Sequence, residues 1–308
     1  MKGSNRLFLH ILTLLLLLIL PSEVFAQKMV KVVTKTISHR LEAPLDSGIL
    51  VQGKKAEVEV TGWDETYIQV EMDLVAKHAN LEVAKEELEY IQYKISKKDA
   101  RYVIENSFFS SRNKARIKSS LSVVYRIFVP INTKVVINNQ YGIVKVLNLF
   151  NSTHLDVKFC DVSFERVFGE IYAKGEYSEF QGKNFDARLK MDTKRTYIEF
   201  KEFAGQIEIQ NNYGDIKLSP SPMLQFLGVI SRHGKVDVIV SSLSAFNYDV
   251  RVNSSYIDLP NTESSFVKSN EKKSEFHFQR KNGLNKANIN ITNLLYPVSI
   301  MAFNQRNP

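Results

Sequence analysis

Cysteine is almost absent from this chain. Its 308 residues include one cysteine, Cys160, so no internal disulfide can form. A chain of this size must then be held together by its hydrophobic core and its backbone hydrogen bonds. Cys160 lies inside a repeated pattern at a position typical of glycine. We expect a small buried residue there, and the alternative is a reactive thiol.

Long apolar runs are also scarce. One mostly apolar run of 14 residues, Leu7 to Leu20, follows Lys2 and Arg6 and precedes Ala26. This layout is typical of a secretory signal peptide over residues 1–26, cleaved after Ala26. The alternative is an uncleaved membrane anchor, but 14 residues of helix span only about 21 Å of a ~30 Å hydrocarbon core. We therefore expect an exported mature chain, in the periplasm or at the cell surface, with no transmembrane segment.

Motifs of known cofactor and catalytic sites are missing from the sequence. There is no phosphate loop, dinucleotide fingerprint or nucleophile elbow, and no metal-binding pair among the histidines of the mature chain, His39, His78, His154, His233 and His277. We expect no cofactor, no metal and no catalytic residues. The net charge of +8 favours an anionic polysaccharide or an acidic envelope protein as partner. No helix-turn-helix, finger or RNA-binding motif indicates nucleic acid.

Short alternating runs of apolar and polar residues are abundant, which is typical of β-strands. From about Thr133 the alternation repeats with a period of 18 residues. Two apolar columns with this step read Val135, Thr153, Ile171, Leu189, Ile207 and Val144, Val162, Phe180, Ile198, Ile216. An antiparallel sandwich also alternates, but a coiled chain stacks equivalent residues at ~4.8 Å and so keeps each column alike. We predict an all-β protein, a single-stranded β-solenoid (β-helix) with coils of about 18 residues.

One column of the repeat is aromatic at four of its five positions, and it reads Tyr141, Phe159, Tyr177, Arg195, Tyr213. Stacked rings would add about 0.5–1.5 kcal/mol per pair, and Arg195 would lie between rings as a cation–π partner. We interpret this column as a structural ladder along one edge. The alternative is a strip that stacks on glycans.

The region before the repeats has a different sequence pattern. Residues 27–130 contain strand-like runs on both sides of a turn at Trp63, and apolar residues at helical spacing follow. We expect an N-terminal β-rich region over 27–130 with a capping helix near 80–92. The solenoid repeats then occupy 131–308 and end in a C-terminal cap, for which the apolar segment 294–303 is the candidate.

An outward-facing column of the repeat contains carboxylates. Asp161 and Glu179 fall on adjacent coils, and Asp215 is in the same column. Two carboxylates about 4.8 Å apart repel each other unless a cation, a proton or a basic neighbour intervenes. We take these three as candidate binding residues for a cation or a sugar. The alternative is a solvated pair relieved by a nearby lysine.

Several short motifs occur together in the chain: Val-Thr-Gly-Trp-Asp at 60–64, an acidic helix, Phe128-Val-Pro130, and Asn-x-Tyr-Gly-x-Ile/Val-x-Val/Leu at 139–146 and 211–218. Over residues 33–260 the sequence resembles a bacterial family of putative adhesins built on a β-strand-repeat domain of unknown function. It departs from the family pattern where Cys160, Ser178 and Thr196 replace the glycine of the coil corner. The resemblance implies an envelope protein and no catalytic residues.

These observations favour a non-catalytic envelope or cell-surface protein, an adhesin or binding scaffold that uses the outer face of the solenoid. One alternative is a polysaccharide-acting β-helix enzyme, which would use Asp161 or Glu179. Another is a periplasmic partner of a membrane signalling regulator. The sequence contains no clustered acid, base and arginine, so we prefer the binding protein.

Overall fold

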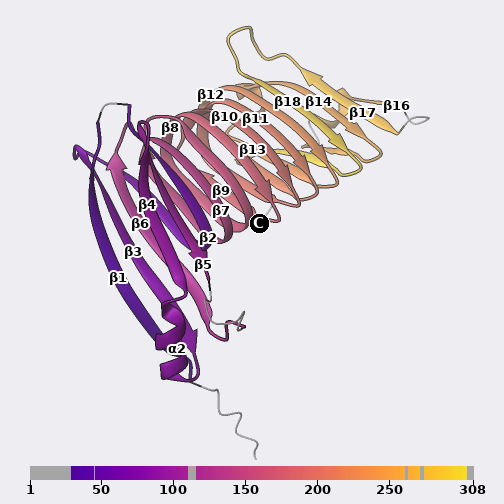
Figure 1. Ribbon diagram of the computed structural model, residues 1–308. Coiled ribbons are helices and arrows are strands. Elements are labelled where there is room, and N and C mark those ends of the chain that lie inside the picture. Colours follow the sequence, from indigo (N-terminus) through magenta and orange to yellow (C-terminus); the bar gives the residue numbers. More distant parts are fainter. Residues whose placement is uncertain (1–28, 45, 110–115, 261–262, 271–273, 304–308) are drawn as a thin grey trace, which may run out of the picture.

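The chain forms an all-β structure. The computed structural model describes residues 29–44, 46–109, 116–260, 263–270 and 274–303 (Figure 1). The predicted signal peptide, residues 1–26, lies outside the described residues. Nearly every described segment is a strand, apart from helix α2, Leu81–Leu88, and two short 3-10 turns. No helix of the described ranges is long and apolar enough to cross a membrane.

The N-terminal strands form a splayed sheet at one end of the molecule (Figure 1). Its strands are β1 (Lys31–Glu42), β3 (Tyr67–His78), β4 (Ile91–Lys98), β5 (Arg101–Phe108) and β6 (Ser120–Pro130). β1 pairs antiparallel with β3, β3 with β6, and β4 with β5. Strand β2 (Gly48–Trp63) pairs in parallel with β5 and β6, and also with β7 (Lys134–Leu149). It therefore joins this N-terminal sheet to the rest of the chain.

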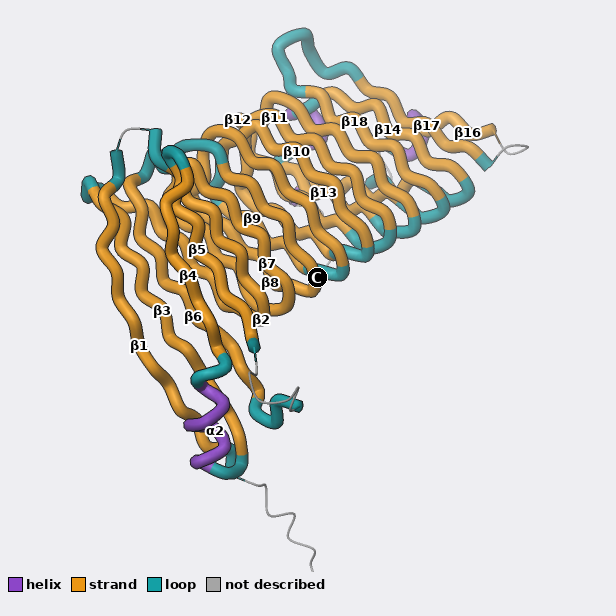
Figure 2. Tube along the Cα trace, viewed as in Figure 1, coloured by secondary structure: helices purple, strands orange, loops and turns teal. Residues whose placement is uncertain are grey.

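The remainder is an elongated stack of parallel strands, seen side by side in Figure 2. It continues with β8 (Thr153–Glu176), β9 (Glu179–Lys183), β10 (Asp186–Lys194), β11 (Tyr197–Asn212), β12 (Ile216–Arg232) and β13 (Val236–Val240). Up to β11, paired residues are 18 positions apart: Val144 pairs with Val162, and Val162 with Phe180. These pairs are the ones that the apolar columns predict. We call each strand segment that forms one level of this stack a rung.

The spacing of the rungs changes within β12. Register shifts follow Lys201, and beyond them Gln206 pairs with Phe226, an offset of 226 − 206 = 20. Two extra residues are therefore accommodated near Pro220, which pairs with Phe203. Proline has no backbone N–H to give to a ladder, so it is tolerated at such an irregular position.

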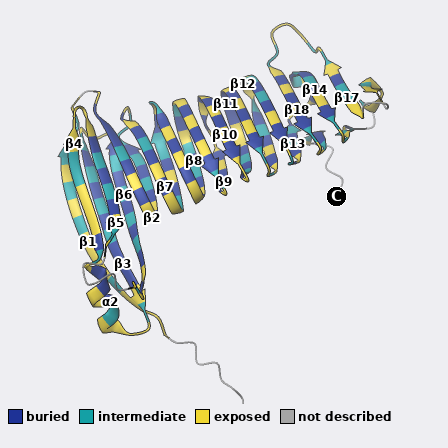
Figure 3. Ribbon diagram, turned by 45° about the vertical axis from the view of Figure 1, so that its right-hand side comes forward, coloured by how far each residue is buried: buried dark blue, intermediate teal, exposed yellow. Residues whose placement is uncertain are grey.

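Side chains of complementary size fill the interior of the stack. Buried residues alternate with more exposed ones along most strands of the stack (Figure 3). Gly182 lies in one column between Phe164 and Phe200, and a β-carbon on Gly182 would stand 2.7 and 2.8 Å from those rings. The two rings reach into this gap and meet edge to face at 5.4 Å. The glycine position, which has no side chain, thus accommodates rings from the rungs on both sides, and this keeps the interior close-packed.

The chain turns where its backbone has positive φ. At one corner φ lies between 51° and 67° for Tyr141, Phe159, Tyr177, Arg195 and Tyr213. At a second corner φ is 52° to 56° for Asn148, Arg166, Asn184 and Glu202. This conformation costs an L-residue about 1–2 kcal/mol. Gly142 and Gly214, which follow Tyr141 and Tyr213, have positive φ as well.

The C-terminal strands interrupt the sequential order. They are β14 (Asn247–Asn253), β15 (Ile257–Asp258), β16 (Val267–Asn270), β17 (Glu275–Arg280), β18 (Asn288–Leu294) and β19 (Val298–Ala302). β18 pairs in parallel with β12 on one side and β14 on the other, while β19 lies between β13 and β15. The antiparallel strands β17 and β16 extend the sheet beyond β14.

The last rung of the chain is therefore inserted between two earlier ones. Segment 294–303, which we expected to cover the open end, instead has a paired neighbour on each side over β19. Strand β13 pairs along all of β19, and β15 pairs at Val298 and Ser299. Val298 and Ile300 are fully buried, because the apolar face of the strand points to the core.

Helix α2 belongs to the N-terminal sheet. Oδ1 of Asn80 accepts hydrogen bonds from the backbone N–H groups of Glu82 and Val83 at 2.8 and 3.4 Å, which starts the helix. Ala84 and Leu88 are buried, and the helix packs on β1 and β3. It lies at the end of that sheet remote from the stack (Figure 2). The predicted capping helix thus exists, but its apolar face covers N-terminal strands and not the first rungs.

Candidate ligand-binding groove

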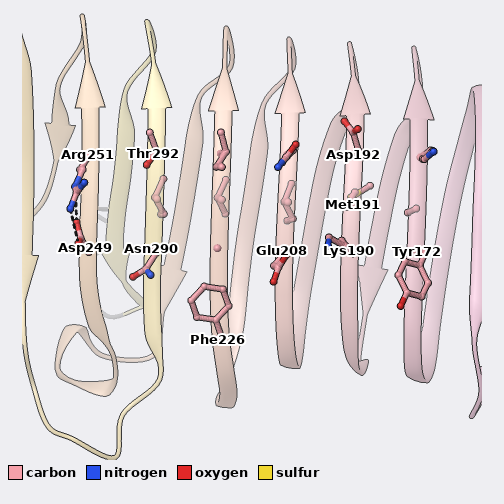
Figure 4. Close-up of a pocket in the computed structure, with 18 residues that line it drawn as sticks. Tyr172, Lys190, Met191, Asp192, Glu208, Phe226, Asp249, Arg251, Asn290 and Thr292 are labelled. Carbon is pink, nitrogen blue, oxygen red and sulfur yellow. Dashed lines mark hydrogen bonds and ion pairs between the residues drawn. The ribbon is translucent and has the colours of Figure 1, made fainter.

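The outer face of the stack has a groove that crosses six strands (Figure 4). The strands are β8, β10, β11, β12, β18 and β14, in that spatial order. The groove has a volume of about 680 Å³, within the range of about 300–1,000 Å³ of small-molecule sites. It runs across the strands, so each strand contributes only two or three side chains to it.

Strand β12 forms an apolar floor with Phe226, Gly228 and Ile230. Gly228 pairs with Glu208 on one side and Asn290 on the other, so the row of side chains is interrupted there. A β-carbon on Gly228 would stand 2.9 Å from Cε1 of Phe226. The ring of Phe226 therefore occupies the space over the glycine, and Ile230 beside it is 49% exposed.

Polar side chains form the two walls of the groove. On one side, β10 and β11 supply Lys190, Asp192, Glu208 and Gln210. On the other side, β18 and β14 supply Asn290, Thr292, Asp249 and Arg251 (Figure 4). Together with Lys174, the lining contains three basic residues and three acidic residues. The formal charge of the groove is therefore zero, although the chain as a whole is basic.

The charged residues of the two walls differ in their partners. Asp249 accepts hydrogen bonds from Nε and Nη2 of Arg251, both at 3.2 Å, and Nε2 of His277 lies 2.9 Å from its Oδ1. Within the described residues, Lys190 and Glu208 form no ion pair, although their strands place them side by side. Their charged ends are therefore free to bind a ligand.

A second aromatic ring marks the far end of the groove. Tyr172 on β8 is 38% exposed and meets the ring of His154 edge to face, with centroids 4.7 Å apart. Tyr172 pairs with Lys190, Lys190 with Glu208, and Glu208 with Gly228. Three strand spacings of ~4.8 Å therefore place Tyr172 about 14 Å from Gly228, the position beside which the ring of Phe226 lies.

The carboxylates predicted from the sequence lie on a different face of the stack. Asp161 and Glu179 are paired in register, and Glu179 accepts a hydrogen bond from Nε2 of Gln181 at 2.7 Å. Asp215 accepts the backbone N–H of Lys235 at 2.8 Å, which ties one rung to the next. The three carboxylates do not converge, and no group of three or more His, Cys, Asp or Glu in the described part of the chain could hold a metal.

The predicted ladder residues stack along one corner: Tyr141, Phe159, Tyr177, Arg195 and Tyr213. Adjacent rings at its start have centroids 4.9 and 5.0 Å apart and are nearly parallel. The guanidinium of Arg195 lies 5.0 Å from the ring before it and 5.6 Å from the ring after it. The ladder continues to His233, 4.4 Å from the ring of Tyr213. Most ring faces are thus covered by neighbours, which leaves mainly ring edges for a sugar.

A buried polar column next to this corner was missed by the sequence analysis. Its members are Asn139, Thr193, Asn211, Ser231 and Asn293. Nδ2 of Asn211 donates to the carbonyl oxygens of Gly214 and Thr196 at 2.8 and 3.1 Å. Each member precedes a positive-φ residue by two positions, a regularity that is visible in the sequence. These side chains satisfy carbonyl groups that would otherwise be buried without a partner.

Cys160 is buried, as expected from its place in the repeat. Its Sγ lies 3.3 Å from the carbonyl oxygen of Lys158. Burial raises the pKa of the Cys160 thiol, which disfavours the reactive thiolate.

No protein-family model and no curated protein matches the chain. Among solved structures, it is similar to a putative cell adhesion protein from Clostridium sporogenes, at 9% identity and a TM-score of 0.27 over 88% of this chain and 100% of that chain. It is also similar to a putative adhesin from Bacteroides fragilis, at 10% identity and a TM-score of 0.34 over 86% and 97%. A putative adhesin from Parabacteroides merdae aligns at 11% identity and a TM-score of 0.34 over 88% and 96%.

Proposed function

We propose that this chain is an exported, non-catalytic binding protein of the bacterial envelope or cell surface, built as a β-solenoid. The groove on the outer face of its stack holds the partner. One observation supports this proposal above others: an open groove crosses six strands, with an apolar floor and polar walls whose charged groups are partly free. Such a mixture of apolar contact area and a few polar groups is typical of binding sites.

The placement of the carboxylates also favours binding over catalysis. Asp161 and Glu179, which an enzyme of the polysaccharide-cleaving kind would use, lie outside the groove lining. Inside the groove, Asp249 is held by Arg251 and His277. Polysaccharide hydrolysis requires a paired acid and base on opposite sides of the bond that is cleaved. The groove walls offer their charges as binding contacts.

The test is polymer retention without polymer cleavage. The mature chain, residues 27–308, is mixed with insoluble peptidoglycan, cellulose and chitin, and with immobilised alginate and polygalacturonate, and both the bound protein and the released sugar ends are measured. We expect retention on at least one polymer with no released ends. The double variant Asp161→Asn with Glu179→Gln is expected to bind equally well. Release of reducing ends that this variant abolishes, or no retention on any polymer, would overturn the proposal.

A further inference from the structure

We infer that the groove binds an uncharged oligosaccharide segment of about three or four sugars, laid across the strands from Tyr172 to Phe226. This inference rests on the proposed function and specifies its ligand class. The groove combines two aromatic rings, one of which lies over Gly228, with walls of balanced charge, and each of these features restricts the ligand.

The floor of the groove suits a ring-shaped ligand with one apolar face. The ring of Phe226 lies over Gly228, because a β-carbon there would contact Cε1 and Cζ of Phe226 at 2.9 and 3.1 Å. The C–H face of a sugar ring can cover such a surface and remove apolar area from water. The hydroxyl groups at the edge of the sugar would then face the amide of Asn290 and the carboxylate of Glu208, which pair with Gly228 from either side.

The charge of the walls disfavours a charged polymer. A polyanion would meet Asp192 and Glu208 on one wall, and a polycation would meet Lys190 and Arg251. With three basic and three acidic residues in the lining, neither sign gains a net attraction. Sugar hydroxyls can donate to carboxylates and accept from ammonium groups, so the free Lys190 and Glu208 can both contribute hydrogen bonds.

The spacing of the two rings sets the length of the ligand. Tyr172 and Phe226 are on strands separated by three spacings, about 14 Å at ~4.8 Å each. One sugar unit of an extended chain is comparable in length with the distance between adjacent strands, which is ~4.8 Å. A chain of three or four sugars therefore reaches both rings, whereas a single sugar reaches only one.

Two other ligand classes fit the groove less well. An extended peptide adds to the edge of a sheet, but the strands that line the groove are paired with neighbours on both sides, as β12 is with β11 and β18. An acyl chain requires a long apolar channel. Here the outward apolar residues are concentrated on β12, at Phe226 and Ile230, and charged or polar residues follow on the adjacent strands.

The inference is tested by calorimetric titration of the mature chain with β-1,4-linked glucose and N-acetylglucosamine oligomers of one to six units, and with a galacturonate hexamer. We expect affinity to rise with length up to three or four units in at least one neutral series, and the galacturonate hexamer to bind more weakly. Gly228→Ala displaces the ring of Phe226 without altering a buried strand residue. It is expected to reduce affinity about tenfold, as is Phe226→Ala, whereas Phe226→Tyr retains binding.

Tyr172→Ala tests the length of the ligand, and Tyr256→Ala is the matched control. Tyr172→Ala is expected to weaken the longer oligomers but not the disaccharide. Tyr256, 57% exposed and outside the groove lining, is the matched control, and its alanine variant is expected to bind normally. If no neutral oligomer binds, or if the Gly228 and Phe226 variants bind as well as the parent chain, the inference is wrong. Retention on the insoluble polymers would then still support the proposed function. Only the absence of that retention would contradict both the proposed function and this inference.

Discussion

The middle of the stack and its C-terminal end are built from the same kind of strand but are assembled differently. From β7 to β11, all pairings have an offset of 18 residues: β7 pairs with β8, β8 pairs with both β9 and β10, and these two strands pair with β11. At the C-terminal end, β18 pairs with β12, whose Gly228 meets Asn290 across 290 − 228 = 62 positions. Local alternation specifies a strand in both regions, but chain order specifies its neighbours only in the first.

The inserted strand β18 at the C-terminal end also forms part of the candidate site. In the middle, the outward columns contain polar residues from successive rungs, such as Tyr172, Lys190 and Glu208. At the C-terminal end, the inserted strand β18 places Asn290 and Thr292 opposite Gly228 and Ile230. One wall of the groove therefore depends on the insertion, and perturbing the inserted strands should affect both stability and binding.

The largest effect is expected from a charge buried in the inserted rung. Ile300 is fully buried, so Ile300→Asp should lower the free energy of unfolding by about 3–5 kcal/mol. Urea unfolding followed by circular dichroism measures this change, and amide exchange should show the loss concentrated in β13, β15 and β19. Met301→Asp, at the neighbouring outward position, is the control and should cost far less. Equal effects of the two variants would mean that β19 is not inserted as described.

An intermediate effect is expected in the buried polar column, and it should be similar in both regions. Asn211 lies in the middle of the stack, and Asn293 in the inserted rung donates Nδ2 to the carbonyl oxygens of Gly234 and Tyr296, both at 2.9 Å. Asn211→Leu and Asn293→Leu each leave carbonyl groups without a partner, at a cost of about 1–3 kcal/mol. Thermal unfolding provides the measurement, with the exposed Asn288→Leu as control. A cost at one site alone would show that the corner differs between the regions.

The smallest effect is expected in the aromatic ladder. Phe159 stacks on two rings at a φ of 55°, so Phe159→Ala should cost about 1–2 kcal/mol. Phe159→Gly loses the same stacking but removes the strain of positive φ, and it should be more stable than the alanine variant by about 0.5–1 kcal/mol. Chemical unfolding of both variants measures the difference. If glycine is the less stable of the two, the backbone strain assigned to this corner is absent.

The sequence predicted the middle of the stack well because one residue there determines the position of the residue 18 later. The pairing of Val144 with Val162 follows from the columns alone, and so do the neighbours of the ladder. The prediction weakened after Pro220, where the offset lengthens to 20. Alternation at 287–291 is typical of a strand, but alternation contains no information on which earlier strand a late one pairs with.

The groove was missed for the same reason. Its one local signal is an apolar residue in an outward position on each side of Gly228, namely Phe226 and Ile230. These residues form the floor of a groove because Asn290 and Thr292, which come much later in the chain, form one of its walls. The carboxylates chosen from the columns, Asp161 and Glu179, belong to the other face.

The most direct test of the inserted rung is cysteine cross-linking in a Cys160→Ser background. Thr292 pairs with Ile230 on one side and with Arg251 on the other. Adjacent strands at ~4.8 Å are within disulfide reach, whereas two spacings, about 9.6 Å, exceed it. We predict disulfides between cysteines at 230 and 292 and between cysteines at 251 and 292, but none between 230 and 251. Efficient cross-linking of 230 to 251 would place β12 directly beside β14 and contradict the inserted rung.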